Sequence, residues 1–206
     1  MESEIEAIST TGLERAEAEL LDLINNPQRQ WETLKAKNNL TRHKIYTESG
    51  INIVKSSGTI PRSAQIVCDA LWDYTRKREW DKGCTEVRLI QEFPSGIRIM
   101  YNSFKSPWPV TDRDFVYASR KVILGSDILM SSANVVTPLC PEKSSHVRGE
   151  MKSSGFLIHP LDDNSCTLTY VVNVDPRGSI PNFAVNKVQE EQSMNVDEIR
   201  KFVVKG

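Results

Sequence analysis

Charged residues gather in two short stretches whose spacing could support acid–base chemistry. The stretch Arg78-Glu79-Trp80-Asp81 brings two carboxylates close to a guanidinium. The pair Arg113-Asp114 places one carboxylate next to a second guanidinium. In an enzyme, a carboxylate held this way could act as a general acid or base. Clusters of opposite charge more often form structural ion pairs and hold turns by hydrogen bonds. We therefore expect both stretches to be structural, with catalysis as the alternative.

The histidines and cysteines form no recognisable catalytic or metal-binding pattern. His43, His146 and His159 are far apart in the sequence, and no H-E-x-x-H, G-x-S-x-G or glycine-rich phosphate loop is present. The four cysteines include no C-x-x-C pair, which disfavours a zinc site and favours free thiols in a reducing compartment. We expect no catalytic residue, no metal and no cofactor.

The overall composition is that of a soluble globular domain. Of the 206 residues, 39% are apolar and 26% are charged, and the net charge is −1. This balance argues against a nucleic-acid binder, which would rely on many lysine and arginine contacts to phosphates. The sequence shows no internal repeat, no signal-peptide core and no apolar run that would span a bilayer. We expect one domain over residues 1–206, monomeric and cytoplasmic.

The elements that position these residues begin with helices and hairpins. Thr11 to Glu14 fits a capping box, and apolar residues at helical spacing predict a helix over about 11–26. Pro61 and Ser63 open a second helix, and a short helical turn carries Arg76 to Trp80. Extended segments between the first two helices are predicted at about 31–37, 40–47 and 51–60, with Asn38-Asn39 as one turn.

The second half of the chain reads as β-structure followed by one long helix. The final helix, about 180–204, has Ser179 as its cap and Pro181 in its first turn. Strands are predicted at about 84–93, 97–105, 113–124, 127–137, 145–159 and 164–175. The apolar face of the final helix is predicted to contain Phe183, Ala184, Val188, Val196, Ile199, Phe202 and Val203.

These elements predict an α+β fold. A run of about nine antiparallel strands tends to curl, and its concave face must be covered by another layer. The C-terminal helix is the only predicted element long enough to cover that face. We therefore expect a curved antiparallel β-sheet wrapped on a long C-terminal α-helix.

Five motifs carry a family resemblance. They are Arg78-Glu79-Trp80-Asp81, the stretch 106–116 that begins Ser106-Pro107-Trp108, Val147-Arg148-Gly149-Glu150, the stretch 155–161 that begins Gly155-Phe156, and the stretch 174–181 that begins Val174-Asp175. In this order and spacing they resemble the START (steroidogenic acute regulatory protein-related lipid transfer) domain family, over about residues 30–204. The resemblance implies a helix-grip fold with one lipid in a tunnel between the sheet and a C-terminal lid helix. Trp108, between two prolines, is expected to be a rigid connector.

The resemblance also implies which residues face the lipid. Because strand residues alternate between faces, Met100 and Phe104 would share the face of Asn102, and Tyr117 would share that of Phe115. Ceramide carriers of the family use a polar cluster at the positions that match Lys77, Asp81, Asn102, Ser132 and Tyr170. The alternative for the first two of these is an exposed ion pair on one helical turn.

Other members of the family carry different lipids. Sterol carriers of the steroidogenic type set an acid and an arginine at the positions that match Met100 and Ser119, and neither charge is present here. Phosphatidylcholine carriers cage the ammonium with aromatic rings, at positions that match Asn102, Phe115 and about Lys152, of which one is aromatic here. The resemblance therefore slightly favours a ceramide- or phospholipid-like ligand over a sterol.

A hairpin from Val122 to Leu129 corresponds to a mobile loop beside the tunnel mouth in the family. Its apolar tip, Ile123, Leu124 and Gly125, follows two basic residues and would suit shallow insertion into an anionic membrane. The alternative is that these residues are ordinary strand positions packed inside the protein.

The resemblance predicts a lipid carrier. We expect one phospholipid, sphingolipid or sterol to be held in an internal apolar tunnel and moved between membranes, with transient membrane contact and no covalent chemistry. Leaving the chains in water would cost about 0.8 kcal/mol per CH₂ group, which is why the enclosure must be apolar. Two other classes stay open. One is a cyclase-type enzyme of the wider superfamily, which would need acid–base groups in its cavity. The other is a lipid sensor that reports to a protein partner.

Overall fold

The structure is a computed structural model in which residues 2–106 and 110–205 are described. Among these residues, nine strands form an antiparallel sheet in the order β1-β2-β3-β11-β10-β7-β6-β5-β4. These strands are β1 (Glu32–Thr33), β2 (Thr41–Ile45), β3 (Ile53–Ile60), β4 (Cys84–Glu92), β5 (Arg98–Phe104), β6 (Asp112–Leu124), β7 (Asp127–Asn134), β10 (Ser154–Asp162) and β11 (Ser165–Val172). The predicted connector at Trp108 lies outside the described residues.

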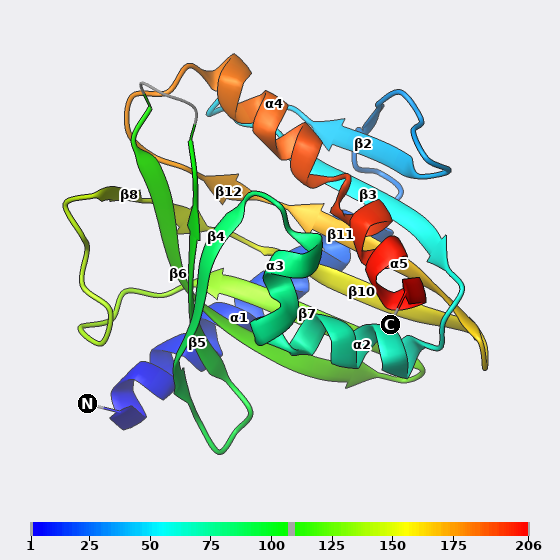
Figure 1. Cartoon of the computed structure of the whole chain (residues 1–206), viewed down its shortest axis with the longest axis horizontal. Coiled ribbons are helices and arrows are strands. Elements are labelled where there is room, and N and C mark those ends of the chain that lie inside the picture. The colour runs from blue at the N-terminus through cyan, green and yellow to red at the C-terminus, as the bar shows by residue number, and fades with distance from the viewer. Residues whose placement is uncertain (1, 107–109, 206) are drawn as a thin grey trace.

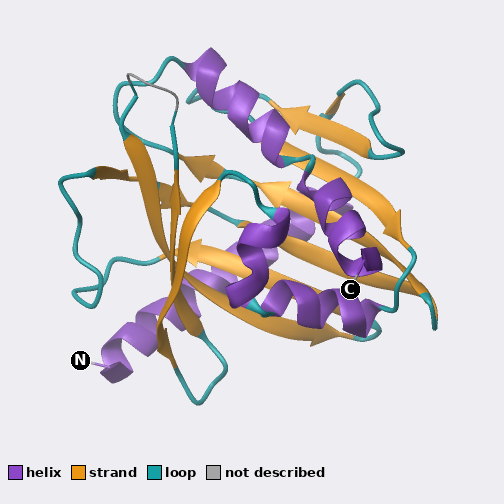
Figure 2. Ribbon diagram, viewed as in Figure 1, coloured by secondary structure: helices purple, strands orange, loops and turns teal. Residues whose placement is uncertain are grey.

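Helices cover both faces of this sheet (Figure 1). The long helix α1 (Glu2–Asn25) lies behind the sheet, and the other helices lie in front of it. The front helices are α2 (Ala64–Trp72), the short 3₁₀ turn η1 (Tyr74–Arg76), α3 (Lys77–Trp80), α4 (Asn182–Gln192) and α5 (Asn195–Lys205). Figure 2 shows the sheet curling, so that β4 and β5 stand across the direction of β10 and β11. The predicted α+β helix-grip architecture is confirmed.

Alternation of side chains gives the sheet two distinct cores. On the concave side, Met130 and Leu168 are buried together with residues of α2 and α5. On the convex side, Val116 and Leu129 are buried in the two clusters that contain the residues of α1. Each fully buried side chain of this size contributes about 1.5–3 kcal/mol. None of the described helices is both long and apolar enough to cross a bilayer.

The N-terminal helix is longer than the sequence predicted. It begins at Glu2, whereas the capping-box pattern placed its start near residue 11. Thr11 lies inside the helix, where its hydroxyl bonds back to the carbonyl of Ala7 at 3.2 Å. Ile5 and Ser9 are buried and continue the packed stripe upstream, so the sheet stabilises turns that have no cap signal of their own.

The C-terminal helix is interrupted between α4 and α5, where the sequence predicted one helix over about 180–204. Side chains of β2 and β3 donate hydrogen bonds to the carbonyl groups at the break. Arg42 Nη2 donates to the carbonyl of Glu190, and Ser56 Oγ donates to that of Ser193, both at 2.6 Å. The amides that follow bond to carbonyls three residues back instead of four. The sheet therefore divides the lid helix into two pieces.

The two pieces are held unequally. Val185 and Gln189 are the buried residues of α4, whereas α5 buries five residues, Val196 and Val203 among them. Phe183 and Val188, which were predicted on the apolar face, are 77% and 49% exposed, respectively. That prediction was wrong because it assumed one continuous helix with a single apolar face, whereas the break between α4 and α5 ends that face. Helix α4 thus buries fewer residues than α5 and is held mainly by hydrogen bonds, such as those of Asn186 with Gly50 and Asn52.

The predicted strand at about 145–159 is also divided. It forms β8 (His146–Arg148), β9 (Glu150–Met151) and β10. Arg148 pairs with Asp114 of β6, with 2.8 Å between Nε and Oδ1, and β8 lies parallel to β6 at this point. Strand β9 then pairs with the short β12 (Val174–Asp175). The predicted Asn38-Asn39 turn is present, and both residues have positive φ, 54° and 58°.

Candidate functional site

A partly enclosed space lies between the concave face of the sheet and helices α2 and α3. Its volume is about 80 Å³, below the roughly 300–1,000 Å³ of most small-molecule sites. Four predicted site residues line it, namely Lys77, Met100, Tyr117 and Ser132. The other lining residues are Leu71, Trp72, Tyr74, Trp80, Val87, Arg98, Ser119, Met130 and Phe156. We call this space the inner cavity.

Lys77 and Asp81 form a buried ion pair beside the inner cavity. Lys77 Nζ and Asp81 Oδ2 are 3.0 Å apart, and the two side chains are 16% and 2% exposed. Lys77 Nζ also lies 4.1 Å from the centre of the Trp80 ring. Burial is the largest single influence on the pKa of Lys77 and works to lower it, but Asp81 together with Tyr117, Tyr170 and Cys84 outweighs burial and the pKa is raised. The pair therefore carries both charges in an interior position.

Asn102 and Tyr117 form a second polar pair on the same face. Asn102 Nδ2 donates to Tyr117 Oη at 2.7 Å, and the two residues are 1% and 8% exposed. Burial raises the pKa of Tyr117 to about 12, and nearby Lys77 opposes the shift only in part. The phenol therefore stays protonated well above neutral pH, and its hydroxyl accepts from Asn102 beside the cavity.

Tyr170 belongs to an aromatic wall around the inner cavity. Its ring stacks on Phe156 with centroids 4.3 Å apart, and Phe156 meets Trp80 edge to face at 6.2 Å. Burial raises the pKa of Tyr170. Tyr170 therefore shares the aromatic wall of the cavity without itself lining the space.

Phe104 and Phe115 pack beside the inner cavity rather than around it. Their rings meet edge to face with centroids 5.7 Å apart, in the same cluster as Met100. Phe115 is the cross-strand partner of Asn102, so both stand on the concave face, as alternation predicts. The predicted site is thus brought together on one face, with some members in contact with the space and others one layer away.

Three buried polar atoms in this region have no hydrogen-bond partner among the described residues. They are Trp80 Nε1, Asp81 Oδ1 and Asn102 Oδ1. Most buried polar groups in folded proteins are paired, and an unpaired one costs about 1–3 kcal/mol. The cluster therefore offers one donor and two acceptors that a bound polar group could satisfy.

Arg98 and Trp72 are cavity residues that the sequence reasoning missed. Arg98 precedes Met100 by two positions and pairs with Ser119 across β5 and β6, so strand alternation could have found it. Its Nη1 donates to the carbonyl of Trp72 at 2.9 Å, and its guanidinium lies 4.1 Å from the centre of the Trp72 ring. Trp72, at the end of a helix, gives no comparable signal.

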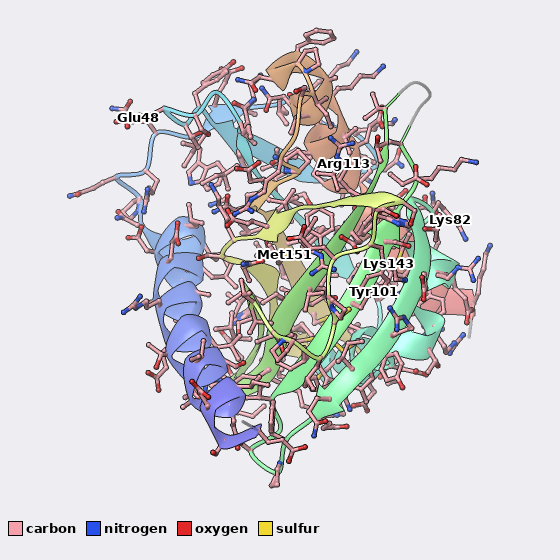
Figure 3. All side chains as sticks on the ribbon, turned by 90° about the vertical axis from the view of Figure 1, so that its left-hand side faces the viewer. Glu48, Lys82, Tyr101, Arg113, Lys143 and Met151 are labelled. Carbon is pink, nitrogen blue, oxygen red and sulfur yellow. The ribbon has the colours of Figure 1, made fainter. Side chains whose placement is uncertain are left out.

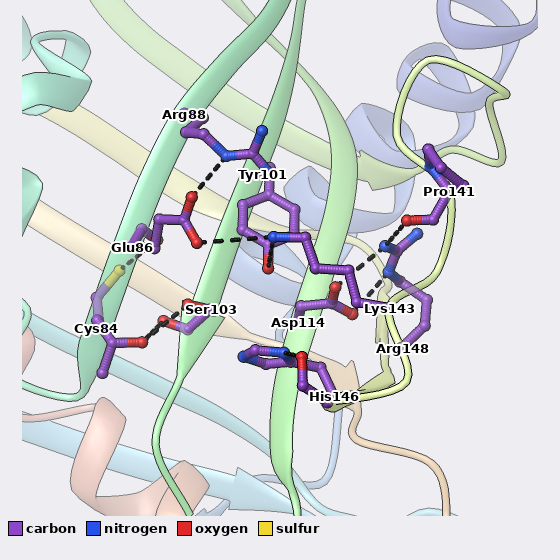
Figure 4. Close-up of polar contacts among 12 residues, drawn as sticks. Cys84, Glu86, Arg88, Tyr101, Ser103, Asp114, Pro141, Lys143, His146 and Arg148 are labelled. Atoms are coloured by element: carbon purple, nitrogen blue, oxygen red, sulfur yellow. Dashed lines mark hydrogen bonds and ion pairs between the residues drawn. The ribbon is translucent and has the colours of Figure 1, made fainter.

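The charged motifs outside this cluster hold backbone segments, as predicted. Arg113 Nε and Nη2 donate to the carbonyls of Pro176 and Arg177. Asp114 accepts two hydrogen bonds from Arg148, at 2.8 and 3.1 Å (Figure 4). Figure 3 shows Arg113 apart from the outer pair formed by Tyr101 and Lys143. These motif residues stabilise connections between strands and lie away from the cavity lining.

The tip of the β6–β7 hairpin is exposed. Ile123 and Leu124 are 62% and 38% exposed, and a Cβ added to Gly125 would meet no atom within 4 Å. Gly125 has φ +64°, which suits the first central position of a two-residue type II′ turn. These residues therefore face solvent at the end of the hairpin. Within residues 2–106 and 110–205, no group of three or more acidic, histidine or cysteine side chains could hold a metal ion.

Comparison with known proteins places this fold and site in context. The model of the START domain matches residues 12–202. Human START domain-containing protein 10 is 30% identical over 124 residues, which are 60% of this chain and 43% of the relative. The chain thus spans less than half the length of that relative. Rat phosphatidylcholine transfer protein is 24% identical over 162 residues, 76% of this chain and 75% of the relative.

A solved structure and an enzyme are also similar to parts of the chain. The structure of human StAR-related lipid transfer protein 5 superposes with a TM-score of 0.85 at 20% identity. The superposed region covers 97% of this chain and 98% of the chain of that protein. Rat acetyl-coenzyme A thioesterase is 28% identical over 152 residues, 71% of this chain and 27% of the relative. The first similarity supports the fold, and the second shows that similar sequences occur within an enzyme.

Proposed function

The chain belongs to the START domain family, and on that basis we propose that it binds one lipid between its curved sheet and the helices that cover the concave face, and carries it between membranes. Two relatives support this proposal: a lipid transfer protein with the same fold and a phosphatidylcholine transfer protein with 24% identity. The proposed activity is non-covalent, and the site is the inner cavity with the polar cluster around it.

The observation that carries the proposal is the set of unpaired polar atoms in an apolar interior. Trp80 Nε1, Asp81 Oδ1 and Asn102 Oδ1 are buried without partners among the described residues. Trp80 lines the inner cavity, and Asp81 and Asn102 contact its lining residues Lys77 and Tyr117. A lipid headgroup or hydroxyl that enters the cavity would supply the missing hydrogen bonds. The aromatic and aliphatic walls, such as Phe156 and Met130, would contact its chains.

The polarity of the cluster favours some lipids over others. The Lys77–Asp81 pair is internally neutralised, so the polar cluster around Asp81 and Asn102 has no spare cation for an anionic group. Its two free acceptors, on Asp81 and Asn102, match a ligand that brings hydroxyl, amide or ammonium hydrogens. We propose a ceramide- or phospholipid-like ligand in preference to a sterol. Arg98 lies across from Ser119, but neither Met100 nor Ser119 supplies an acid to pair with it.

The titratable groups around the cavity favour a carrier over a cyclase-type enzyme. A general acid or base works best when its pKa lies near the working pH. Here the pKa of Tyr117 is raised to about 12 by burial, and the pKa values of Tyr170 and Lys77 are also raised. None of these three groups exchanges a proton readily at neutral pH. The similarity to a thioesterase keeps an enzyme as the second candidate.

Loading requires the inner cavity to expand. Its present volume of about 80 Å³ is small for a lipid. We propose that α4, which does not line the inner cavity, moves away from the sheet to let the space extend toward it. It buries Val185 and Gln189 alone and is separated from α5 by the break, and its movement would break the hydrogen bonds to Gly50, Asn52 and Val174. The contacts of Arg42 and Ser56 with the break would form the hinge. Movement of one short helix exposes less surface than movement of the whole C-terminal segment.

The exposed hairpin tip is the proposed membrane contact. Ile123, Leu124 and Gly125 stand clear of both cores, and two basic residues, Arg120 and Lys121, precede the tip. An apolar tip beside basic residues suits brief, shallow contact with an anionic bilayer surface. On this proposal the protein works in the cytoplasm as a monomer and meets membranes only during exchange.

Liposome exchange tests the function directly. Donor vesicles carrying fluorescent ceramide, phosphatidylcholine or sterol are mixed with unlabelled acceptors and a catalytic amount of protein. We expect transfer of ceramide or phospholipid above a heat-denatured control, and a complex of one lipid per chain in native mass spectrometry. If the protein binds and moves no lipid of any class, the carrier function is wrong. Lipid binding without transfer would favour the sensor.

A further inference from the structure

A second hollow lies on the outer side of the wall of the inner cavity. It has a volume of about 240 Å³ and is lined by Asp69, Trp72, Asp73, Tyr74 and Arg98. Trp72, Tyr74 and Arg98 also line the inner cavity. The two spaces are therefore neighbours that share these three side chains as a wall. We call the second space the outer hollow.

Arg98 holds this shared wall in place. Its Nη1 donates to the carbonyl of Trp72, where α2 ends, and its Nε donates to Glu92 at the end of β4, both at 2.9 Å. The positive charge suits the C-terminal end of the helix. Among the described residues, Nη2 of Arg98 makes no hydrogen bond. The guanidinium thus keeps a free donor edge in the lining of the outer hollow.

The same lining carries negative charge and aromatic rings. Asp69 Oδ1 accepts from Gln65, and Asp73 Oδ1 accepts from Thr75. The Oδ2 atoms of both aspartates have no partner in the described parts of the chain. Carboxylates and aromatic rings attract an ammonium group, and a guanidinium binds phosphate. The outer hollow therefore presents partners for both charges of one zwitterion.

We propose that the outer hollow binds the zwitterionic headgroup of a phospholipid, with Arg98 on the phosphate and Asp69 and Asp73 on the ammonium. A headgroup held there sets its chains against the wall of Trp72 and Arg98, which leads to the inner cavity. The inference rests on the proposed carrier function and adds to it a capture site at the surface. A zwitterionic headgroup meets both Arg98 and the two aspartates, whereas a phosphate alone meets only Arg98, so we expect the site to prefer zwitterions.

Soluble headgroups test this site without a membrane. Glycerophosphocholine is the probe, and glycerol 3-phosphate and choline each supply one of its charges. NMR follows the indole N–H of Trp72 and the Nε–H of Arg98. We expect glycerophosphocholine to shift both signals in a saturable way, at concentrations at least fivefold lower than either single-charge compound. No shift at these residues, or equal binding of glycerol 3-phosphate, would overturn the proposal.

Two arginine variants form a matched pair for the same titration. Arg88 has similar contacts on the opposite face of the sheet, since its Cζ lies 4.3 Å from the centre of the Tyr101 ring and its Nε 2.7 Å from Glu86 Oε1. We expect Arg98→Gln to weaken glycerophosphocholine binding at least tenfold and Arg88→Gln to leave it unchanged. An equal loss in both variants would show a general charge effect and overturn the site.

Asp69→Asn probes the other end of the headgroup and avoids a folding defect. Asp69 is exposed, and an asparagine there keeps an acceptor for Gln65. We expect this variant to bind glycerophosphocholine and choline more weakly and glycerol 3-phosphate no less tightly. A uniform change for all three compounds would contradict a site with two charged ends. Liposome transfer is read separately, because transfer without headgroup binding overturns this site alone, whereas absence of transfer counts against the carrier function.

Discussion

Two buried aspartates, on opposite faces of the sheet, differ in how many of their carboxylate oxygens have hydrogen-bond or ion-pair partners. Asp114 and Asp81 are each 1% exposed. Both oxygens of Asp114 accept from Arg148, which also donates to two backbone carbonyls (Figure 4). Asp81 Oδ2 faces Lys77 at 3.0 Å, but its Oδ1 has no partner among the described residues. Both aspartates belong to motifs of the same family resemblance.

The difference separates a pair that holds strands together from a pair that has binding capacity left. A buried carboxylate with all its hydrogen bonds made has nothing to offer a ligand. One with a free oxygen beside a cavity is destabilised until a donor arrives, by about 1–3 kcal/mol for the unpaired group. Motif membership therefore does not identify the site. The face of the sheet and the unsatisfied atoms do.

The largest expected effect comes from breaking these pairs. Asp114→Ala should lower the free energy of unfolding by about 3 kcal/mol, because the half-buried Arg148 loses its carboxylate partner and cannot lose its proton. Asp81→Ala should cost less, because Lys77 can deprotonate, yet it should weaken lipid binding. Urea denaturation and lipid titration measure both. If Asp81→Ala lost as much stability as Asp114→Ala and bound lipid with unchanged affinity, the proposed difference between the two aspartates would be wrong.

Alkaline unfolding sharpens the concave side of the comparison. Burial raises the pKa of Tyr117 to about 12, above the value of about 10 expected in the unfolded chain. The folded state thus favours the neutral phenol. This contribution to stability is fully present below about pH 10 and is lost as the pH rises toward 12. At pH 11, Tyr117→Phe should remove a part of that loss on the order of 1 kcal/mol. Urea unfolding at pH 7, 10 and 11 measures it, and an unchanged slope with pH would count against a buried neutral phenol.

A pair of hydroxyl deletions distinguishes the faces with a smaller effect. Tyr170→Phe keeps the stack on Phe156 and should weaken lipid binding by about 1 kcal/mol, with stability nearly unchanged. Tyr101→Phe removes a hydroxyl on the convex face that Lys143 contacts at 3.5 Å, and lipid affinity should not change. Isothermal titration with the preferred lipid compares them. Unchanged affinity in Tyr170→Phe would remove that residue from the site.

Short-range pattern was sufficient for most strands of the sheet and for the relative faces of the predicted site residues on β5 and β6. Alternation put Met100, Asn102 and Phe104 on one side, and the same rule extends to Arg98. It did not show which of these residues border a space, because a cavity depends on how α2 and α3 pack above them. The polar members of the site were suggested by family resemblance and not by spacing.

The features that the local sequence pattern did not predict depend on contacts between distant segments of the chain. The break in the C-terminal helix depends on Arg42 and Ser56, about 140–150 positions earlier in the chain. The division of the strand at 145–159 accompanies the bond between Asp114 and Arg148. Helical and strand propensities are local averages and contain no term for such partners. Trp72 was missed for the same reason, since only the bond from Arg98 places it at the cavity wall.

The smallest expected change in stability is at the hairpin tip, which belongs to neither face. Leu124 is 38% exposed and Ile123 is 62% exposed, so a charge at Leu124 removes little packing and the free energy of unfolding should change by less than about 0.5 kcal/mol. On a bilayer the same charge would enter the interface, so Leu124→Asp should weaken liposome association by about 1 kcal/mol and slow transfer in proportion.

Ser126→Asp is the control, because it adds the same charge two positions away at a site that is already polar. Melting temperature, vesicle co-sedimentation and transfer rate are measured on both variants. A large drop in melting temperature for Leu124→Asp would mean that the tip belongs to a core after all, and equal slowing by the two variants would mean that charge near the membrane, and not the apolar tip, sets the rate.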